Sequence, residues 1–401
     1  MANPNVEAKP SNARKQAEEY LANPRFHKKV TVAQGGDRGD VVVSYAEYGF
    51  HGANGSPAQN AAAVTVPTVL FLPGMFASRY LGVGMHIFAV KHGVRVLVPD
   101  RFGFGKTEDV PVQDRIKEWV ALIPAFLQAL RIEHVALMSH SSGTIYNMNL
   151  LWHCRQILHP ERPLVCFLAP FVDGGYSKAP LILALQTLPN VSFGYWNRLA
   201  SFISLRASGT IEASSGIFSR LTRALGLSGR AKGEREQSEW DRNATVIERD
   251  YGLDFTTQAE LDKLTIKGMF SEETVGANSE AINCLKKGPK GSWGEAEDMN
   301  ALVGRIAKRE REAENRPGNG GKLGVRIYFS GSDVMTGRRG QQYFEACWRG
   351  KEGEYDDCLD VWAMTVEDSD HDSVVKRVEV LSSFFDMAAE TSDTSELSKG
   401  Q

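Results

Sequence analysis

Short apolar segments alternate with longer amphipathic segments through the first half of the chain, and this alternation constrains the fold more than any other feature. A short apolar run without polar interruption is typical of a strand buried on both faces of a sheet. Such strands are expected at 41–48, 68–72, 94–98, 135–138 and 164–168, with helices at 80–92, 112–130 and 143–158. Strands and helices that alternate in this way predict an α/β protein with a doubly wound, mostly parallel sheet.

The alternation stops after residue 170 and resumes near residue 324, where strands at 325–329 and 359–364 and a last helix at 373–388 are expected. The residues between, 171–323, read as helices and loops rich in large apolar side chains: Tyr195, Trp196, Phe202, Phe218, Trp240, Tyr251, Phe255, Phe270 and Trp293. We therefore expect a polar N-terminal extension (1–26), an α/β core (27–170 and 324–390), a mostly helical cap (171–323) and a disordered tail (391–401).

The composition excludes several classes of protein. A formal net charge of −3 over 401 residues does not suggest a nucleic-acid binder, so no nucleic-acid partner is expected. No run of about 18 apolar residues occurs, so no integral membrane segment is expected. The first 26 residues are polar and partly acidic and lack the apolar segment of a signal peptide, which predicts a cytoplasmic protein.

The cysteines are odd in number, scattered, and not spaced as metal ligands: Cys154, Cys166, Cys284, Cys347 and Cys358. Such cysteines are typical of buried thiols in a reducing compartment. No cluster of cysteine and histidine suggests a zinc site, and we expect neither a metal nor a cofactor.

The turn Ser139-His140-Ser141-Ser142-Gly143 lies between an expected strand and an expected helix. A serine with small residues at both second neighbours suits a strained nucleophile turn, because bulky groups there would clash with the strand and the helix. Ser141 is therefore the candidate nucleophile. Ser142 is a poorer candidate, since its upstream second neighbour is the bulky His140. The leading position holds Ser139 where glycine is usual, and a simple helix cap is the alternative role for this turn.

A serine nucleophile requires a base that removes its proton. After Ser141 the chain contains only His153, His159 and His371. The first two lie in or just after the helix that leaves the nucleophile, too near to fold back onto it. His371 follows the last strand, where a base at the sheet edge is expected, so it is the candidate base; an ordinary surface histidine is the alternative.

A carboxylate must orient this base, and two aspartates follow core strands. Asp333 closes the strand through Ser330-Gly331-Ser332, and Asp173 lies just beyond the strand at 164–168. We favour Asp333 and keep Asp173 as the alternative acid; an Asx turn or helix cap is the other role for Asp333. Asp370 and Asp372 adjoin the base but are badly placed to reach its far nitrogen.

Two backbone donors are expected to hold the oxyanion of the reaction. The N–H of Ser142 follows from the turn itself. The second donor should come from the loop after Leu72-Pro73-Gly74, where glycine permits close approach; Met75 is the candidate, with Phe76 as the alternative.

The sequence contains five features in a fixed order: Leu72-Pro73-Gly74-Met75, the segment 99–105, the Ser141 turn, Gly331-Ser332-Asp333 and His371. In order and spacing they resemble the α/β-hydrolase-fold enzymes, and in particular their capped esterase-like branch. The similarity extends over about 41–388, and 285–291 followed by Asp298 resembles the end of the cap in that branch. The resemblance implies hydrolysis of an ester, thioester or lactone through an acyl-enzyme.

Two departures from the family pattern bear on this expectation. Pro73 stands where the family commonly has histidine, and a serine nucleophile argues against the epoxide-hydrolase and dehalogenase relatives, which need a carboxylate. The aromatic cap favours a medium-sized apolar acyl substrate. The same triad also serves C–C bond hydrolysis and acyl transfer in a biosynthetic pathway, and a non-catalytic binding protein on this fold is the alternative from a different class.

Overall fold

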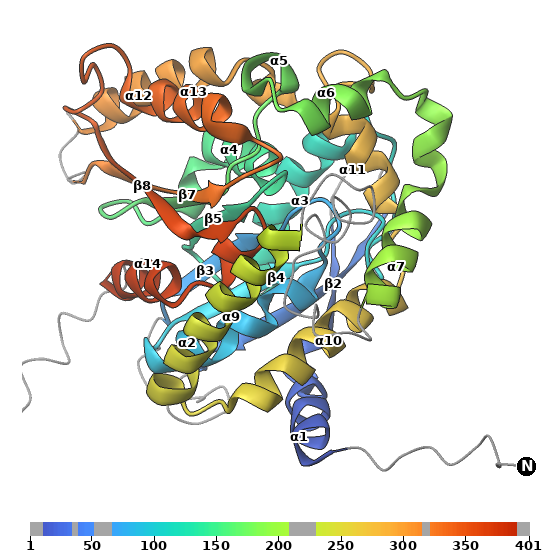
Figure 1. Cartoon of the computed structure of the whole chain (residues 1–401). Coiled ribbons are helices and arrows are strands. Elements are labelled where there is room, and N and C mark those ends of the chain that lie inside the picture. The colour runs from blue at the N-terminus through green and yellow to red at the C-terminus, as the bar shows by residue number, and fades with distance from the viewer. Residues whose placement is uncertain (1–10, 34–38, 52–65, 208–229, 315–320, 391–401) are drawn as a thin grey trace, which may run out of the picture.

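The computed structural model describes residues 11–33, 39–51, 66–207, 230–314 and 321–390 (Figure 1). The expected tail at 391–401 and Phe218 of the cap lie outside the described residues.

A single eight-stranded sheet runs through the described part of the chain, in the order β1-β2-β4-β3-β5-β6-β7-β8. The strands are β1 (Lys28–Val32), β2 (Val41–Gly49), β3 (Thr68–Leu72), β4 (Arg95–Pro99), β5 (Ala136–His140), β6 (Leu164–Leu168), β7 (Leu323–Ser332) and β8 (Leu359–Asp370). Strand β2 pairs antiparallel with β1 and β4, and every other pair is parallel. The predicted fold class, a mostly parallel α/β sheet with a helical insertion, is confirmed.

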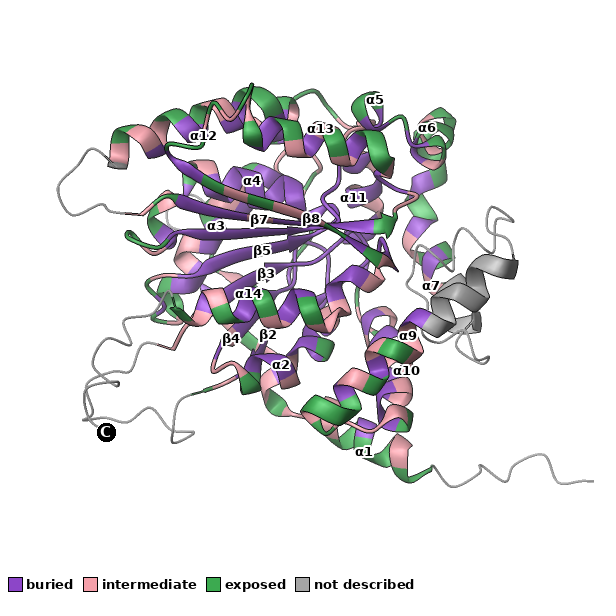
Figure 2. Cartoon of the chain, turned by 60° about the vertical axis from the view of Figure 1, so that its left-hand side comes forward, coloured by how far each residue is buried: buried purple, intermediate pink, exposed green. Residues whose placement is uncertain are grey.

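Helices cover both faces of the sheet (Figure 2). One face carries α3 (Arg115–Ala129), α4 (Gly143–His153), α12 (Met299–Glu314) and α13 (Gly337–Arg349), and the other carries α2 (His86–Lys91) and α14 (Val378–Glu390). Successive side chains of β3 alternate between the two apolar cores: Leu70 and Leu72 belong to one, Val69 and Phe71 to the other. Burial on both faces is the physical reason why the central strands appear as unbroken apolar runs in the sequence.

Some elements differ from the expectation. The segment expected as one helix at 80–92 is the 3₁₀ helix η2 (Arg79–Met85) followed by the short α2. Gly82 lowers the α-helical propensity of this segment and packs so closely on Tyr48 that a Cβ atom would overlap the tyrosine ring. The edge strand β1 was not predicted. Strand β8 continues to Asp370, so residues 367–370, predicted as loop, belong to the strand.

The insertion between β6 and β7 is helical where the structure describes it. It contains α5 (Gly174–Ser177), α6 (Pro180–Thr187), η4 (Asn190–Tyr195), α7 (Trp196–Ala207), α9 (Arg230–Tyr251), α10 (Phe255–Ser271), α11 (Gly276–Cys284), η6 (Gly294–Asp298) and α12. Helix α12 packs beside α13 on the sheet, whereas α9 and α10 lie at one end of it (Figure 2). The predicted N-terminal extension forms a helix, α1 (Asn12–Leu21), which packs on α10 through the ion pair Arg14–Glu260 at 3.2 Å.

Candidate active site

Ser141 lies in the turn that joins β5 to α4 and has a backbone φ of +51°. This left-handed conformation is costly for a residue other than glycine, so the surrounding structure must hold it. The amide of Ser141 donates to the carbonyl of Leu168 at 3.1 Å, and its own carbonyl accepts from Thr144 at 3.0 Å. At Gly143 a Cβ atom would overlap the carbonyl oxygen of Leu72, which explains the small residue on that side of the turn.

The unusual Ser139 has a polar partner within the core. Its hydroxyl is fully buried and accepts a hydrogen bond from Asn147 Nδ2 at 2.9 Å. The same amide group donates to the carbonyl of Cys166 at 3.3 Å. Because burying a hydroxyl is costly unless it is hydrogen-bonded, Asn147 explains how serine replaces glycine at this position.

Three carboxyl ends of parallel strands bring the predicted Ser141, Asp333 and His371 together. The hydroxyl of Ser141 lies 2.7 Å from Nε2 of His371. On the other side of the ring, Nδ1 lies 3.0 Å from both carboxylate oxygens of Asp333. Oδ1 of Asp333 also accepts from the amides of Met335 at 2.9 Å and Thr336 at 2.8 Å, which fixes the carboxylate. This is the arrangement of a nucleophile, a base and an orienting acid.

Charge within this buried group shifts both pKa values in the direction that base catalysis requires. Burial by itself would raise the pKa of Asp333, but the adjacent His371 and the two backbone amides outweigh it and lower the pKa. Burial would likewise lower the pKa of His371, but the Asp333 carboxylate outweighs it and raises the pKa above 6.5. The imidazole is therefore a stronger base than a free histidine.

The alternative acid, Asp173, lies away from the base. It is the N-cap residue of α5, where its Oδ1 accepts from the amide of Gly175 at 2.6 Å and its Oδ2 lies 3.7 Å from Lys286 Nζ. Asp370 likewise caps a turn, accepting from the amide of Ser373 at 2.7 Å. The geometry thus favours Asp333 over Asp173, because Asp333 is the carboxylate in contact with His371 Nδ1.

The loop after β3 lies against the nucleophile. A Cβ atom at Gly74 would be only 3.1 Å from Cβ of Ser141, so glycine permits a close approach here. Met75 follows directly on this loop, and Ser142 is the N-cap residue of α4, whose positive end faces the turn. Both predicted oxyanion donors are buried: Ser142 follows Ser141 in the turn, and Met75 follows Gly74 on the loop that packs against Ser141.

A buried charge network that was not predicted holds this loop. Arg101 donates to the carbonyl oxygens of Pro73 and Gly74, the latter at 2.8 Å. Its charge is balanced by Glu280 of the cap helix α11, at 3.4 Å, which also pairs with Arg115 at 3.1 Å. Arg101 belongs to the 99–105 motif, but its partners lie far away in the sequence. It stabilises the loop in which Pro73 replaces the histidine common in the family.

His140 was also not predicted as a site residue, because only histidines after Ser141 were considered as bases. Its Nε2 donates to the backbone carbonyl of His371 at 2.7 Å, and the two rings lie 5.3 Å apart. Burial, with a smaller contribution from His371, lowers the pKa of His140 to about 3, so the ring stays neutral. His140 therefore supports the backbone of the candidate base rather than competing with it for the serine proton.

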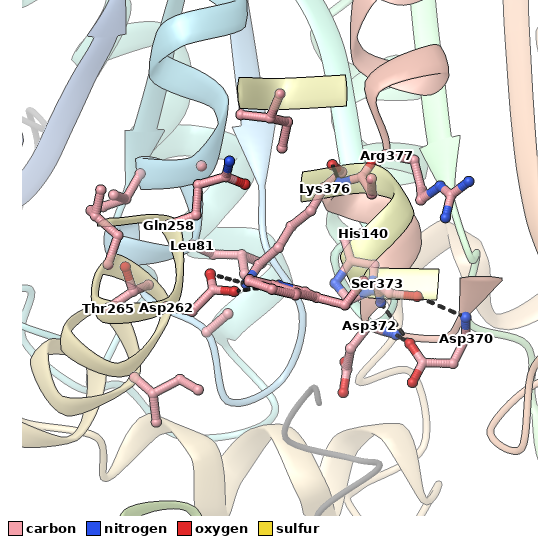
Figure 3. A pocket seen from close by; sticks show the side chains of 18 of the residues that line it. Leu81, His140, Gln258, Asp262, Thr265, Asp370, Asp372, Ser373, Lys376 and Arg377 are labelled. Atoms are coloured by element: carbon pink, nitrogen blue, oxygen red, sulfur yellow. Dashed lines mark hydrogen bonds and ion pairs between the residues drawn. The ribbon is translucent and has the colours of Figure 1, made fainter. Parts of the chain in front are cut away.

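A cavity of about 140 Å³ adjoins the loop after β3. It is lined by the loop and His140, by side chains of α9 and α10 such as Trp240 and Leu261, and by Tyr20 of α1. Figure 3 shows His140 on one side of this cavity and Gln258 and Thr265 of α10 on the other. Ser141 and His371 do not line it. Of its lining residues, His140 belongs to the nucleophile turn and Gly74 packs against it, so the cavity lies next to this turn.

Within the described residues, no group of three or more histidine, cysteine or acidic side chains is arranged to hold a metal ion. All five cysteines are buried free thiols. Among the helices that the structure describes, none is long and apolar enough to cross a membrane.

Residues 69–265 match the sequence model of the Alpha/beta hydrolase family. A comparison with curated protein sequences gave no match. Among solved structures, a thermophilic esterase from Thermogutta terrifontis is similar, with 10% identity, 91% of this chain and 99% of that chain covered, and a TM-score of 0.48. An epoxide hydrolase from Vigna radiata has 16% identity, 90% and 95% coverage and a TM-score of 0.45. A haloalkane dehalogenase from Agrobacterium tumefaciens C58 has 12% identity, 91% and 96% coverage and a TM-score of 0.47. On the match over residues 69–265, this part of the chain belongs to the alpha/beta hydrolase family.

Proposed function

We propose that this hydrolase is a serine esterase, cleaving an ester, thioester or lactone through an acyl-enzyme on Ser141. The observation that carries the proposal is the continuous hydrogen-bonded chain from Ser141 through His371 to Asp333, built on a strained turn at the carboxyl edge of the sheet. A serine in this chain suits acyl transfer. Alkyl-enzyme chemistry, as in relatives with a carboxylate nucleophile, requires a residue that this turn does not contain.

The proposed reaction has two halves. In the first, Ser141 Oγ attacks the carbonyl carbon while His371 Nε2 takes its proton, and Asp333 stabilises the resulting imidazolium. The amides of Met75 and Ser142 hold the oxyanion, and His371 then gives the proton to the leaving alcohol, thiol or hydroxyl. In the second half, His371 removes a proton from water, which attacks the acyl carbonyl; His371 then returns this proton to Ser141 Oγ as the ester bond breaks and the acid leaves.

The cavity supports an apolar group of moderate size in the substrate. Its walls are mainly apolar, with Leu81, Ile87 and Met269 among them. An apolar cavity of about 150 Å³ can hold a molecule the size of benzene, so a cavity of about 140 Å³ suits an acyl or alcohol group of that size. The substrate class inferred is therefore a carboxylic ester, thioester or lactone with a short to medium apolar chain.

A panel of esters, thioesters and lactones of increasing chain length tests the proposal, together with labelling by a fluorophosphonate probe. The wild type should turn over at least one member and be labelled, whereas Ser141→Ala should lose both properties. Ser142→Ala is the matched control, because it removes the neighbouring hydroxyl and keeps the backbone amide; it should still be labelled. Equal turnover by wild type and Ser141→Ala would overturn the proposal. Product analysis separates hydrolysis from acyl transfer and C–C cleavage.

A further inference from the structure

Large apolar side chains are exposed along one segment of the cap. Of the eleven such side chains in the described part of the chain, seven lie between Tyr176 and Phe202. Val191 of η4 is 81% exposed and Tyr195 is 67% exposed. Figure 1 shows α6 and α7, which bracket these two residues in the chain, along an outer edge of the molecule. Exposed apolar residues that gather on one surface mark an interaction site, whereas single scattered ones do not.

The helical segment formed by η4 and α7 carries apolar side chains on two opposite sides. Val191, Tyr195 and Leu199 recur every four residues, so they lie on one side of the segment, and all three are exposed. Phe193 and Trp196, on the other side, are buried in the apolar core. A helix that only covers a core is polar on its outer side. Packing of the fold therefore does not account for the outer apolar stripe of Val191, Tyr195 and Leu199.

Hydrogen bonds hold this segment on the rest of the cap. Asn278 of α11 accepts from the amide of Asn197 at 2.8 Å and donates to the carbonyl of Gly194 at 3.1 Å. Asn190 Nδ2 donates to the carbonyl of Lys287 at 3.2 Å. The stripe is therefore mounted on an ordered base, so docking through it would cost little conformational entropy.

The charges along this segment are positive. Residues 174–211 contain no acidic residue but contain Lys178, Arg198 and Arg206, in a chain whose formal net charge is −3. Lys178 and Arg198 are exposed, and the guanidinium of Arg198 lies 5.4 Å from the centre of the Tyr195 ring. Positive charge beside an exposed apolar stripe is complementary to the anionic headgroups and the apolar interior of a lipid bilayer.

Acidic side chains at the borders of this face are engaged within the protein. Asp173, which precedes the segment, lies 3.7 Å from Lys286 Nζ. Glu272 lines a hollow of the surface together with Arg198, and it pairs with Arg79 at 2.6 Å. These carboxylates are balanced by cations other than Lys178 and Arg198.

We propose that this face docks on the surface of an anionic lipid bilayer, where Val191, Tyr195 and Leu199 enter the apolar layer and Lys178 and Arg198 contact headgroup phosphates. Residues 187–192 are exposed without exception, so the turn before the stripe projects from the molecule. A projecting turn inserts into a fluid layer, whereas a second copy of the chain would have to offer a matching hollow on the same patch. The inference goes beyond the proposed esterase function and does not depend on it.

Co-sedimentation of the full chain with lipid vesicles tests the proposal. One set of vesicles consists of phosphatidylcholine, and the other of phosphatidylcholine and phosphatidylglycerol in equal amounts. The wild type should bind the anionic set about 10-fold more tightly or better, and added salt should remove most of this difference. The double variant Lys178→Gln/Arg198→Gln should lose most of the preference, because it removes both exposed cations.

The apolar contribution is tested by placing a charge in the stripe. Val191→Asp should weaken binding to the anionic vesicles by about 10-fold or more, because the buried apolar group is lost. Val90→Asp is the matched control, since Val90 is 47% exposed on α2, away from α7 (Figure 1). Both positions are exposed, so both variants should fold, and thermal unfolding checks this.

A fluorescent label reports directly whether the stripe enters the bilayer. The five native cysteines are buried, so a thiol-reactive dye sensitive to polarity can be attached selectively to Val191→Cys. Its emission should shift to the blue when anionic vesicles are added, and the same dye on Val90→Cys should show no shift.

Several results would overturn the inference. They are absence of vesicle binding by the wild type, equal binding to both kinds of vesicle, and binding that Val191→Asp leaves unchanged. A dimer in sedimentation velocity that Val191→Asp dissociates, without vesicle binding by the wild type, would likewise overturn it and would assign the face to a second copy of the chain.

Discussion

Nε2 of His371 lies 2.7 Å from Oγ of Ser141, although 230 positions separate the two residues in the chain. The contact exists because β5 and β8 end at the same edge of one parallel sheet, where the residue after each strand faces the other. Asp333, after β7, completes the group from the strand that pairs with β8. The predictions below test this relationship and the structure that holds it.

Asp333 should be the acid that orients His371. Asp333→Asn removes the carboxylate that faces Nδ1, and the loss of this charge and of the correct tautomer should lower kcat by roughly 10⁴-fold. Asp173→Asn is the matched control, because asparagine also caps a helix and the capping role of Asp173 should survive. Steady-state kinetics on an ester that the wild type cleaves provides the measurement. A larger loss in Asp173→Asn would reverse the assignment.

The activity should depend on the protonation of His371. Only the neutral imidazole accepts the Ser141 proton, so kcat/KM should rise as the pH increases through the pKa of His371. The Asp333 carboxylate raises this pKa above 6.5, so the wild-type midpoint should lie above that value. In Asp333→Asn the raising charge is gone and burial remains, so the midpoint of the residual activity should move to lower pH. A midpoint that stays or moves upward would contradict the pairing.

Glycine should be required at position 143 for packing. A Cβ atom there would overlap the carbonyl oxygen of Leu72, and this backbone atom cannot move without disturbing β3. Gly143→Ala should lower the free energy of unfolding by about 1–3 kcal/mol and reduce activity by displacing Ser141. Gly84→Ala is the control, since its nearest neighbour is Lys376 Cγ at 4.0 Å and should tolerate a methyl group. Urea unfolding of both variants measures the difference, and equal stabilities would count against this packing argument.

Arg101 should stabilise the protein and organise the loop after β3. In Arg101→Met the carboxylate of Glu280 loses one of its two cationic partners in a fully buried site, which should cost about 3–5 kcal/mol of unfolding free energy. Activity should fall as well, because the carbonyls of Pro73 and Gly74 lose their donor. Arg311→Met, at the partly exposed pair with Asp357, should cost no more than about 1 kcal/mol.

The double variant Arg101→Met/Glu280→Gln separates charge from packing. Neutralising Glu280 removes the partly unpaired buried charge, so the double variant should be more stable than Arg101→Met alone. Thermal or urea unfolding shows the difference. A double variant that is less stable would mean that Glu280 stabilises the fold mainly through its other partners, Arg115 and Tyr146.

Structural features that depend on residues close together in the sequence, such as the central strands, were predicted well. The central strands β3, β5 and β6 are buried at every position because both faces are covered, and most of their residues are apolar, so this burial is visible in the sequence. The prediction of a single helix at 80–92 was wrong. Gly82 of this segment packs directly on the Tyr48 ring, a contact with a distant strand that no local pattern contains. The C-terminal part of β8 was missed for a similar reason: its polar residues were predicted as a loop, but the strand continues past a register shift and Asp370 pairs with Ser332 of β7.

The sequence by itself determined the alternating α/β core and a serine turn at a strand end, with one histidine and two candidate aspartates, Asp333 and Asp173, following later strands, because periodicity and turn chemistry are local properties. Only the tertiary structure decided that Arg101 holds the carbonyls of Pro73 and Gly74 while Glu280, 179 positions away, balances its charge. It also decided that His140 presents an unpaired nitrogen beside Ser141. These contacts join segments that are far apart in the sequence and that only tertiary packing brings together. The hydrogen bonds and charges of a buried side chain depend on which other buried groups lie beside it once water is excluded.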